Sequence, residues 1–281
     1  MSLSHYSCDN CGFWQQYFAA PPFCPVCSDV RNALPENGWN FVSVDEFKRR
    51  ETFGEVQCSW RFVEDDIVMF TNSPQIGIGS NGYLILRDSG NISFEAAGFY
   101  TQNALDKIKE LGGISILSSS HPHGFGALWQ LESEFQPETV LFQREAVQFT
   151  KAITVNQIFD DELKIDDEIS LHYVGGHYEG HSVLYYSTRK TLFCGDALKF
   201  ETENGITTGV SCHKAFHKQI PLSPREIEKY REVLSKLDFT QTFTPFEHNA
   251  DSTNEDAMRL FEAQLQAKKT FTTPLTITRN L

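Results

Sequence analysis

Four cysteines near the N-terminus constrain this chain more than any other feature of its sequence. Cys8 and Cys11 form one close pair and Cys24 and Cys27 a second, with two residues inside each pair. Such a spacer folds back so that both thiolates face one ion, and two pairs can close a tetrahedral site. A segment of about thirty residues cannot bury enough core to fold alone, so metal binding would supply the missing folding energy. The spacing therefore predicts a four-cysteine metal knuckle.

Three other features limit the class of protein: the remaining cysteines, the length and the charge. Cys58, Cys194 and Cys212 are scattered and odd in number, which is not the pattern of a secreted disulfide framework. The 281 residues carry a net charge of −13 and no Lys- or Arg-rich run, unlike a nucleic-acid binder. No apolar stretch reaches the length of a membrane span. We therefore expect a cytoplasmic protein with neither a nucleic-acid nor a membrane partner.

The composition changes near residue 32. Residues 1–32 are rich in Cys, Pro and aromatic side chains, whereas β-like runs and helical patterns alternate over residues 33–281. A helix is predicted from an N-cap at Ser223 to Leu237, and another over residues 254–267. Strands and helices in mixed order predict an α/β or α+β main domain behind a small N-terminal module. Strands are expected at residues 67–70, 82–86, 91–95, 114–117, 140–142, 169–173, 182–186 and 191–193.

Potential metal ligands lie at the ends of several predicted strands of the main domain. His121 and His123 are on a turn directly after one strand, where both rings can be aimed at one ion. His181, Asp196 and His248 lie in later loops at strand ends. Neutral imidazoles with a carboxylate suit zinc or non-haem iron. The order of these residues predicts a second metal site.

This order of motifs resembles that of the metallo-β-lactamase superfamily, over approximately residues 65–250. His121 and His123 match the first two histidines of the family's His-x-His-x-Asp-His motif. In the segment Gly-His-x-x-Gly-His-Ser, His181 is assigned to the ligand position. Asp196, after a glycine, matches the bridging carboxylate, and His248 the family's last histidine. The resemblance implies a four-layer αββα sandwich with metal bound at the loop edge.

The first motif departs from the family pattern at two positions. Phe125 and Gly126 stand where the family has its Asp and third His, and neither can bind metal. In two-metal members these two residues, with the last histidine, hold the second ion. We therefore expect one ion, held by the three matching histidines with Asp196 beside it. The ring of Phe125 is expected to fill and dry the space of the second ion.

The knuckle resembles the rubredoxin-like module of the rubrerythrins. Tyr6 lies two residues before the first cysteine, Gly12 follows the second and Pro25 follows the third. Ser28 replaces the glycine that the family usually has after the last cysteine. Four thiolates accept zinc or iron, and so does a histidine-carboxylate site. Zinc or iron is therefore expected at each site.

Three functions fit these residues. Three histidines around zinc lower the pKa of bound water toward about 7, Asp196 could orient or deprotonate this water, and His248 could protonate a leaving group. This predicts a hydrolase that acts on an ester, thioester or similar bond of a small molecule. A mononuclear non-haem iron oxidoreductase would use the same ligands. The loss of two family ligands instead suits a retired enzyme that serves as a binding module. We place the hydrolase first.

Four further residues are weighed as supporting groups. His177 is expected at the surface or behind a ligand. His213 and His217 lie four residues apart, and we expect them on a solvated helix face or a pocket rim. Glu95 stands where the superfamily often has an Asp that supports the metal loop, and it is expected to bond a ligand histidine.

Overall fold

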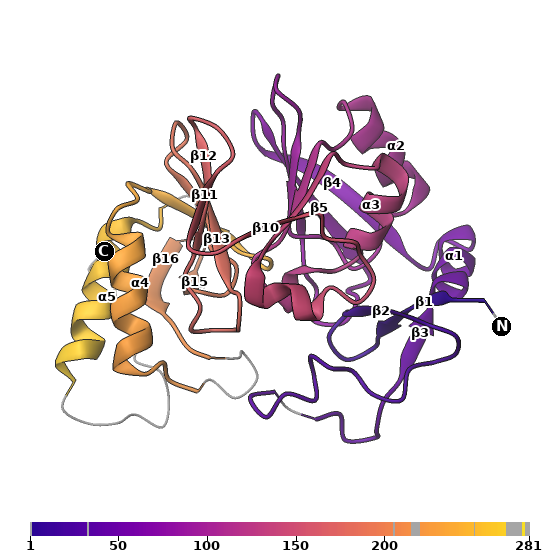
Figure 1. The fold of residues 1–281 in the computed structure, drawn as a ribbon, viewed down its shortest axis with the longest axis horizontal. Coiled ribbons are helices and arrows are strands. Elements are labelled where there is room, and N and C mark those ends of the chain that lie inside the picture. Colours follow the sequence, from indigo (N-terminus) through magenta and orange to yellow (C-terminus); the bar gives the residue numbers. More distant parts are fainter. Residues whose placement is uncertain are drawn as a thin grey trace. The chain divides into compact units, whose positions relative to one another are not determined.

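The computed structural model describes residues 2–32, 34–204, 206–214, 220–249, 251–267 and 277–278. The chain forms two compact units (Figure 1). Unit 1 comprises Met1–Phe142 with Ala146–Ile158, and unit 2 comprises Gln143–Glu145 with Phe159–Leu281. In the described ranges, no helix has both the length and the apolar character needed to cross a membrane.

Unit 1 is built around a mixed β-sheet. Its strands are β4 (Gln57–Glu64), β5 (Ile67–Ser73), β6 (Gly82–Ile85), β7 (Ile92–Phe94), β8 (Ile116–Ser118), β9 (Thr139–Gln143) and β10 (Gln157–Phe159). They lie in the order β10-β9-β8-β7-β6-β5-β4. Strands β4 to β7 are antiparallel neighbours, whereas β8 pairs in parallel with β7 and β9. Loops at the ends of β7 and β8 therefore lie at one edge of the sheet.

A smaller sheet and several helices complete unit 1. The small sheet has the order β2-β1-β3. Its strands are β1 (Ser4–Cys8), β2 (Trp14–Tyr17) and β3 (Phe41–Ser43). The helices are α1 (Val44–Thr52), α2 (Gln102–Glu110), α3 (Leu128–Phe135) and the 3-10 turn η1 (Pro122–Gly124). A second 3-10 turn, η2 (Arg144–Phe149), has its first two residues in unit 2 and the rest in unit 1.

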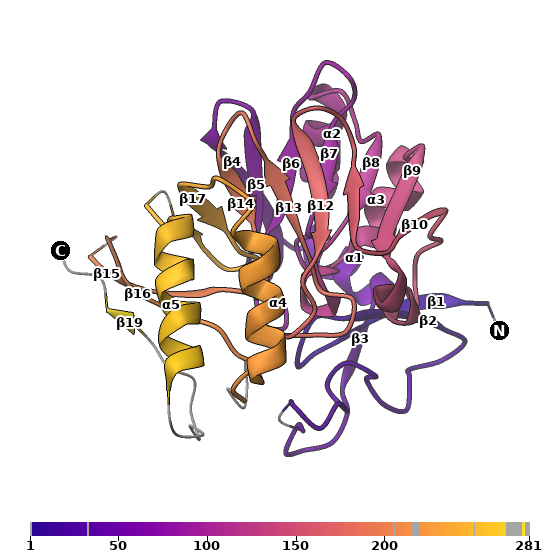
Figure 2. The same ribbon diagram turned by 60° about the vertical axis from the view of Figure 1, so that its left-hand side comes forward.

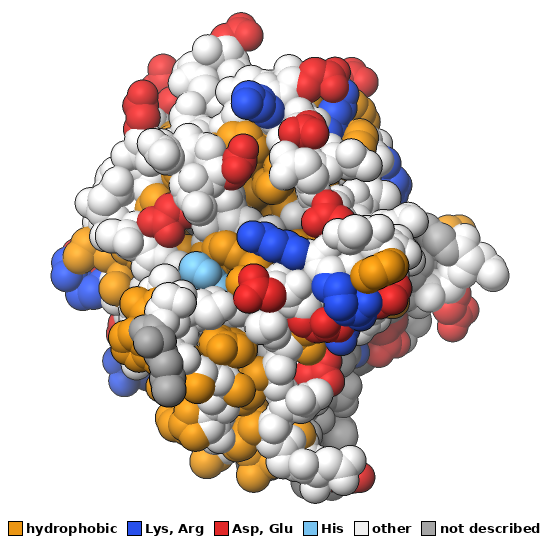
Figure 3. All heavy atoms as spheres, turned by 90° about the vertical axis from the view of Figure 1, so that its right-hand side faces the viewer, with side chains coloured by type: hydrophobic (Ala, Val, Ile, Leu, Met, Phe, Trp, Pro, Cys, Tyr) orange, Lys and Arg blue, Asp and Glu red, His pale blue; other side chains and the backbone are white. Residues whose placement is uncertain are grey.

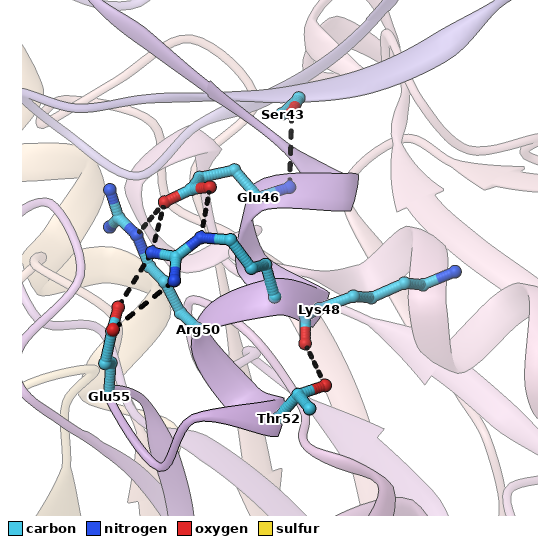
Figure 4. Close-up of polar contacts among 7 residues, drawn as sticks. Ser43, Glu46, Lys48, Arg50, Thr52 and Glu55 are labelled. Carbon is cyan, nitrogen blue, oxygen red and sulfur yellow. Dashed lines mark hydrogen bonds and ion pairs between the residues drawn. The ribbon is translucent and has the colours of Figure 1, made fainter.

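Helix α1 connects the small sheet to the rest of unit 1. Ser43 caps it by accepting the backbone N–H of Glu46, and the Glu46 carboxylate pairs with Arg50 (Figure 4). These surface ion pairs contribute little to stability, because water screens them. The buried ring of Phe47 instead fixes the helix, with its centroid 5.2 Å from that of Trp14 in β2.

One hydrophobic core extends from the N-terminal segment into the large sheet. The four N-terminal cysteines, Phe13 and Trp14 belong to the same buried cluster as Leu117 and Phe142 of the sheet. Unit 1 thus includes both sides of the boundary expected near residue 32, and a separately folded module over residues 1–32 stays a prediction. Apolar side chains also reach the surface on the lower part of the face in Figure 3, and those exposed in the N-terminal segment include Tyr17, Phe18, Phe23, Val30 and Leu34.

Unit 2 combines two sheets with a pair of helices. Its larger sheet, in the order β11-β12-β13-β14-β17-β18, comprises β11 (Glu162–Lys164), β12 (Ile169–Tyr173), β13 (Ser182–Tyr186), β14 (Thr191–Phe193), β17 (Gln241–Phe243) and β18 (His248–Asn249). Its smaller sheet comprises β15 (Lys199–Glu203), β16 (Ile206–Ser211) and β19 (Ile277–Thr278). Helices α4 (Pro224–Leu234) and α5 (Asn254–Gln266) lie side by side (Figure 2). Their buried side chains share a core with Val183 and Leu192 of the sheet. The predicted α+β class is confirmed.

Candidate metal centres

The four N-terminal cysteines meet in one buried cluster, as the sequence predicts. The Sγ atoms of Cys8 and Cys27 lie 4.0 Å apart, and those of Cys11 and Cys24 lie 3.7 Å apart. All four sulfur atoms lie within 4.8 Å of one another. A tetrahedral ion with metal–sulfur bonds of about 2.3 Å places its ligands about 3.8 Å apart. The cluster therefore fits a four-thiolate metal site.

Hydrogen bonds within the cluster act differently on its four thiols. The Asn10 side-chain amide donates to Cys27 Sγ over 3.2 Å. Hydrogen bonds among the thiols hold the pKa of Cys8 and Cys27 below the usual range, whereas such bonds and burial raise the pKa of Cys11 and Cys24. Metal binding requires deprotonated cysteines, so an ion that binds all four would displace protons from the cluster.

We expect Cys8→Ser to remove one equivalent of metal from the protein, because a hydroxyl is a poor replacement for a thiolate ligand. Elemental analysis of the purified variant beside the wild type would measure this loss. Cys58→Ser is the matched control, since Cys58 lies apart from the cluster and should leave the metal content unchanged. A Cys8→Ser protein with the full metal content would contradict the knuckle.

His121 and His123 form a buried pair at the end of β8. Their ring centroids lie 5.3 Å apart with the planes at 85°. Ser120 Oγ lies 2.7 Å from His121 Nδ1 and anchors that nitrogen, so that Nε2 is the atom able to bind an ion. Burial lowers the pKa of His121 well below its usual range. The ring is therefore neutral, as a metal ligand must be.

Glu95 supports the loop that carries this pair. The loop comprises residues 119–127 and is called the histidine loop below. The Glu95 carboxylate accepts hydrogen bonds from the Ser119 hydroxyl and from the backbone N–H of Ser120, at 3.3 Å for the latter. A Cβ at Gly124 would lie 1.8 Å from Glu95 Oε2, so this approach requires glycine. The predicted supporting role thus acts through the two residues before His121.

Phe125 and Gly126 are part of the packing of unit 1. The Phe125 ring is buried, with its centroid 5.1 Å from that of Phe142 and 6.3 Å from that of Phe13. Gly126 has φ +39°, and a Cβ there would lie 2.3 Å from the carbonyl oxygen of Ala96. Neither position could hold a metal-binding side chain without rearrangement.

His177 and Asp196 form a second pair, within unit 2. His177 Nδ1 lies 2.7 Å from the carbonyl oxygen of His213. A carbonyl can only accept, so Nδ1 carries the hydrogen and Nε2 of the neutral ring is an acceptor. Nε2 lies 3.6 Å from Asp196 Oδ2. Two facing acceptors repel each other, so this arrangement favours a cation or a proton between them.

The loop Gly175–Gly180 places His177 in this position. Gly175 and Gly176 both have positive φ, which allows a tight turn. Tyr230 of α4 accepts the backbone N–H of His177 over 3.1 Å and donates to the carbonyl of Gly175 over 2.9 Å. His177 is fully buried. The surface position considered for it is therefore wrong.

His181 makes a different contact in the same unit. Its Nε2 lies 3.1 Å from the carbonyl oxygen of Cys194, to which it donates. Its ring centroid is 5.5 Å from that of His177. His181 is thus bound to the strand end that leads to Asp196, and a role as a ligand would have to use Nδ1.

Two further histidines belong to unit 2. His213 is buried, its ring centroid lies 5.7 Å from that of His177, and burial lowers its pKa to about 4. The solvated or rim position expected for it is wrong, and His217 lies outside the described residues. His248 pairs with Phe243 of β17, which pairs with Phe193 of β14. It thus lies at the sheet edge where β14 leads to Asp196.

No protein-family model matches the chain. The uncharacterized protein YmaE of Bacillus subtilis (strain 168) is 24% identical over 272 residues, covering 93% of this chain and 97% of YmaE. Among solved structures, VMB-1 aligns with a TM-score of 0.55 at 14% identity, over 74% of this chain and 98% of VMB-1. The metallo-β-lactamase DIM-1 aligns with a TM-score of 0.54 at 13% identity, over 74% of this chain and 98% of DIM-1.

A third structure is the mono-zinc form of the metallo-β-lactamase FIM-1 from Pseudomonas aeruginosa. It aligns with a TM-score of 0.52 at 10% identity, over 75% of this chain and 97% of FIM-1. These likenesses confirm the metallo-β-lactamase fold that the motif order predicted.

Proposed function

We propose that the protein is a metal-dependent hydrolase whose ion is bound by His121, His123 and His177, with Asp196 beside it. The observation that carries the proposal is the 3.6 Å approach of His177 Nε2 to Asp196 Oδ2, two acceptors that a cation would bridge. The proposal gives the third histidine position to His177 instead of His181, because His181 Nε2 donates to a carbonyl. That the two pairs share one ion is part of the proposal.

The donor set fits a single zinc ion better than a pair of ions. All four side chains are buried, and each offers one ligand atom. Ser120 anchors His121, and the His213 carbonyl anchors His177, as the outer partners of metal-bound histidines usually do. Iron would accept the same donors, so the metal content of protein purified with and without air tests the oxidoreductase alternative.

The chemistry follows from the groups around this set. A zinc ion held by these histidines would supply a water molecule whose pKa is lowered to about 7. Asp196 is the carboxylate that would orient such a water and accept its proton. The neutral His213 ring beside His177 keeps the site free of further positive charge. His248, paired with the end of the strand beside β14, is the group proposed to protonate the leaving group. The substrate is proposed to be an ester, a thioester or a similar small molecule.

We expect Asp196→Asn to reduce kcat by about 10²–10⁴-fold, the usual scale of general acid–base catalysis, while the protein stays folded. Turnover on a panel of esters and thioesters would be measured with the metal content of the same samples. Asp167→Asn, which removes a carboxylate from an exposed turn of unit 2, is the matched control. Unchanged turnover in Asp196→Asn would contradict the assigned role. Absence of turnover by the metal-loaded wild type on the whole panel would favour the binding module.

A further inference from the structure

We propose that the four-cysteine knuckle is a positioning element of the histidine loop, so that occupancy of the first metal site controls the second. The inference rests on the proposed function only where it names His121 and His123 as ligands. It is carried by three contacts within unit 1 that join the knuckle to the second half of the loop and to the helix that follows it.

The first contact is aromatic. The carbonyl oxygen of Phe13 accepts the backbone N–H of Cys8 over 2.9 Å, so Phe13 belongs to the turn that brings the first cysteine pair together. Its ring packs against that of Phe125, which lies two residues after His123. Both rings are buried. If the turn of the knuckle unfolds, Phe13 no longer packs against Phe125, and one side of the Phe125 ring loses its contact.

The second contact runs through the backbone. The indole nitrogen of Trp14 donates to the carbonyl of Gly98 over 2.8 Å. Gly98 directly follows the two residues that hold the histidine loop. Ala96 N–H donates to the Gly124 carbonyl, and Ala127 N–H donates to the Ala97 carbonyl, each over 2.8 Å. Trp14 thus fixes the backbone of residues 96–98, to which the histidine loop is hydrogen-bonded.

The third contact fixes the helix that follows the loop. Trp129, in the first turn of α3, stacks on His5 of β1 with centroids 3.9 Å apart and planes at 8°. The Trp14 ring lies 5.2 Å from it on the β2 side. The start of α3 is therefore packed against both strands of the N-terminal hairpin. A metal ion that orders the four cysteines also orders this packing, because Trp14 lies in one buried cluster with the cysteines and Trp129 packs against that cluster.

The test compares the zinc-loaded wild type with two full-length variants. Cys8→Ser/Cys11→Ser removes half of the knuckle ligands, and Phe13→Ala keeps all four cysteines but removes the aromatic contact. Amide hydrogen exchange across residues 119–128 is the first readout. The affinity of the histidine site for Co²⁺ is the second, since thiolate-bound and imidazole-bound cobalt absorb differently. Phe62→Ala, which truncates a half-exposed phenylalanine on β4, is the matched control.

We expect both variants to lose exchange protection in the histidine loop and to bind Co²⁺ there about 10–100-fold more weakly, the scale of a lost supporting contact. Phe13→Leu should restore most of the protection, and Phe62→Ala should change neither readout. Wild-type exchange and cobalt affinity in Phe13→Ala would overturn the inference, even if the double cysteine variant fails to fold. A different result separates the two proposals. If the variants lose exchange protection in the loop but the wild type binds no Co²⁺ at the histidines, the positioning role is supported and the proposed function is refuted.

Discussion

Replacing His177 with alanine is expected to abolish metal binding at the histidine site while the four-cysteine site stays loaded. The variant removes the Nε2 atom that faces Asp196, whereas the backbone contacts of residue 177 with Tyr230 remain. Loss of a ligand should cost more than the about 10–100-fold in affinity that loss of a supporting residue costs. The metal content measured by elemental analysis should therefore fall by one ion per chain.

His181→Ala is the matched comparison, because it removes an equally buried histidine four residues further along the chain. Its Nε2 holds the Cys194 carbonyl, so we expect a weakened site that still fills at high zinc concentration. Competition with a chelator would give both affinities. If His181→Ala empties the site and His177→Ala does not, the ligand is His181, as the motif match first indicated.

Replacing Gly126 with alanine is expected to destabilise unit 1 severely. The residue has φ +39°, and the new Cβ would lie 2.3 Å and 2.5 Å from the carbonyl oxygens of Ala96 and Ala97. The backbone conformation alone costs about 1–2 kcal/mol. Displacement of the close-packed backbone should add about 1–3 kcal/mol. Urea denaturation followed by tryptophan fluorescence would measure the sum.

Gly38→Ala separates the two causes. Gly38 also has positive φ, at +78°, but no atom lies within 4 Å of a Cβ built there. We expect it to lose only about 1–2 kcal/mol. Equal losses for the two variants would mean that the space around Gly126 is not closed. The comparison also bears on the missing second ion, since a histidine at position 126 could not enter this space to bind one.

Much of the fold could be predicted from local signals. The helix expected from Ser223 begins where the structure has α4, because the Ser223 hydroxyl and the Glu226 carboxylate form a capping box and Pro224 fits the first turn. The cysteine cluster was also predictable, because the ligand spacing within each pair is set by a short turn. The order of the metal motifs was sufficient to identify the fold.

The contacts that distinguish His177 from His181 were not predictable in the same way. His177 and His181 lie in one short segment with glycines before each of them. His177 is held by partners far along the chain, namely Tyr230 on α4 and the carbonyl of His213 after β16, whereas His181 contacts the carbonyl of Cys194. His213 was misplaced for a related reason. A spacing of four residues indicated a helix face, whereas His213 follows a buried strand.

The packing of the knuckle into unit 1 is also a long-range feature. Trp14 and Gly98, which share a hydrogen bond, are separated by 84 positions in the sequence. Nothing in the local pattern around the cysteines indicates this partner. The same holds for Phe125, whose apolar ring suggested a lost ligand but not its contact with Phe13.

Anomalous scattering from crystals of the zinc-loaded protein, collected at the zinc edge, tests the central claim most directly. Two peaks per chain are expected. One should lie among the four N-terminal cysteines, and the other among His121, His123 and His177, beside Asp196. A pair of peaks about 3.5–4 Å apart at the histidines, the spacing of a two-metal site, would contradict a mononuclear centre. A histidine site without a peak would contradict the proposed metal-dependent function itself.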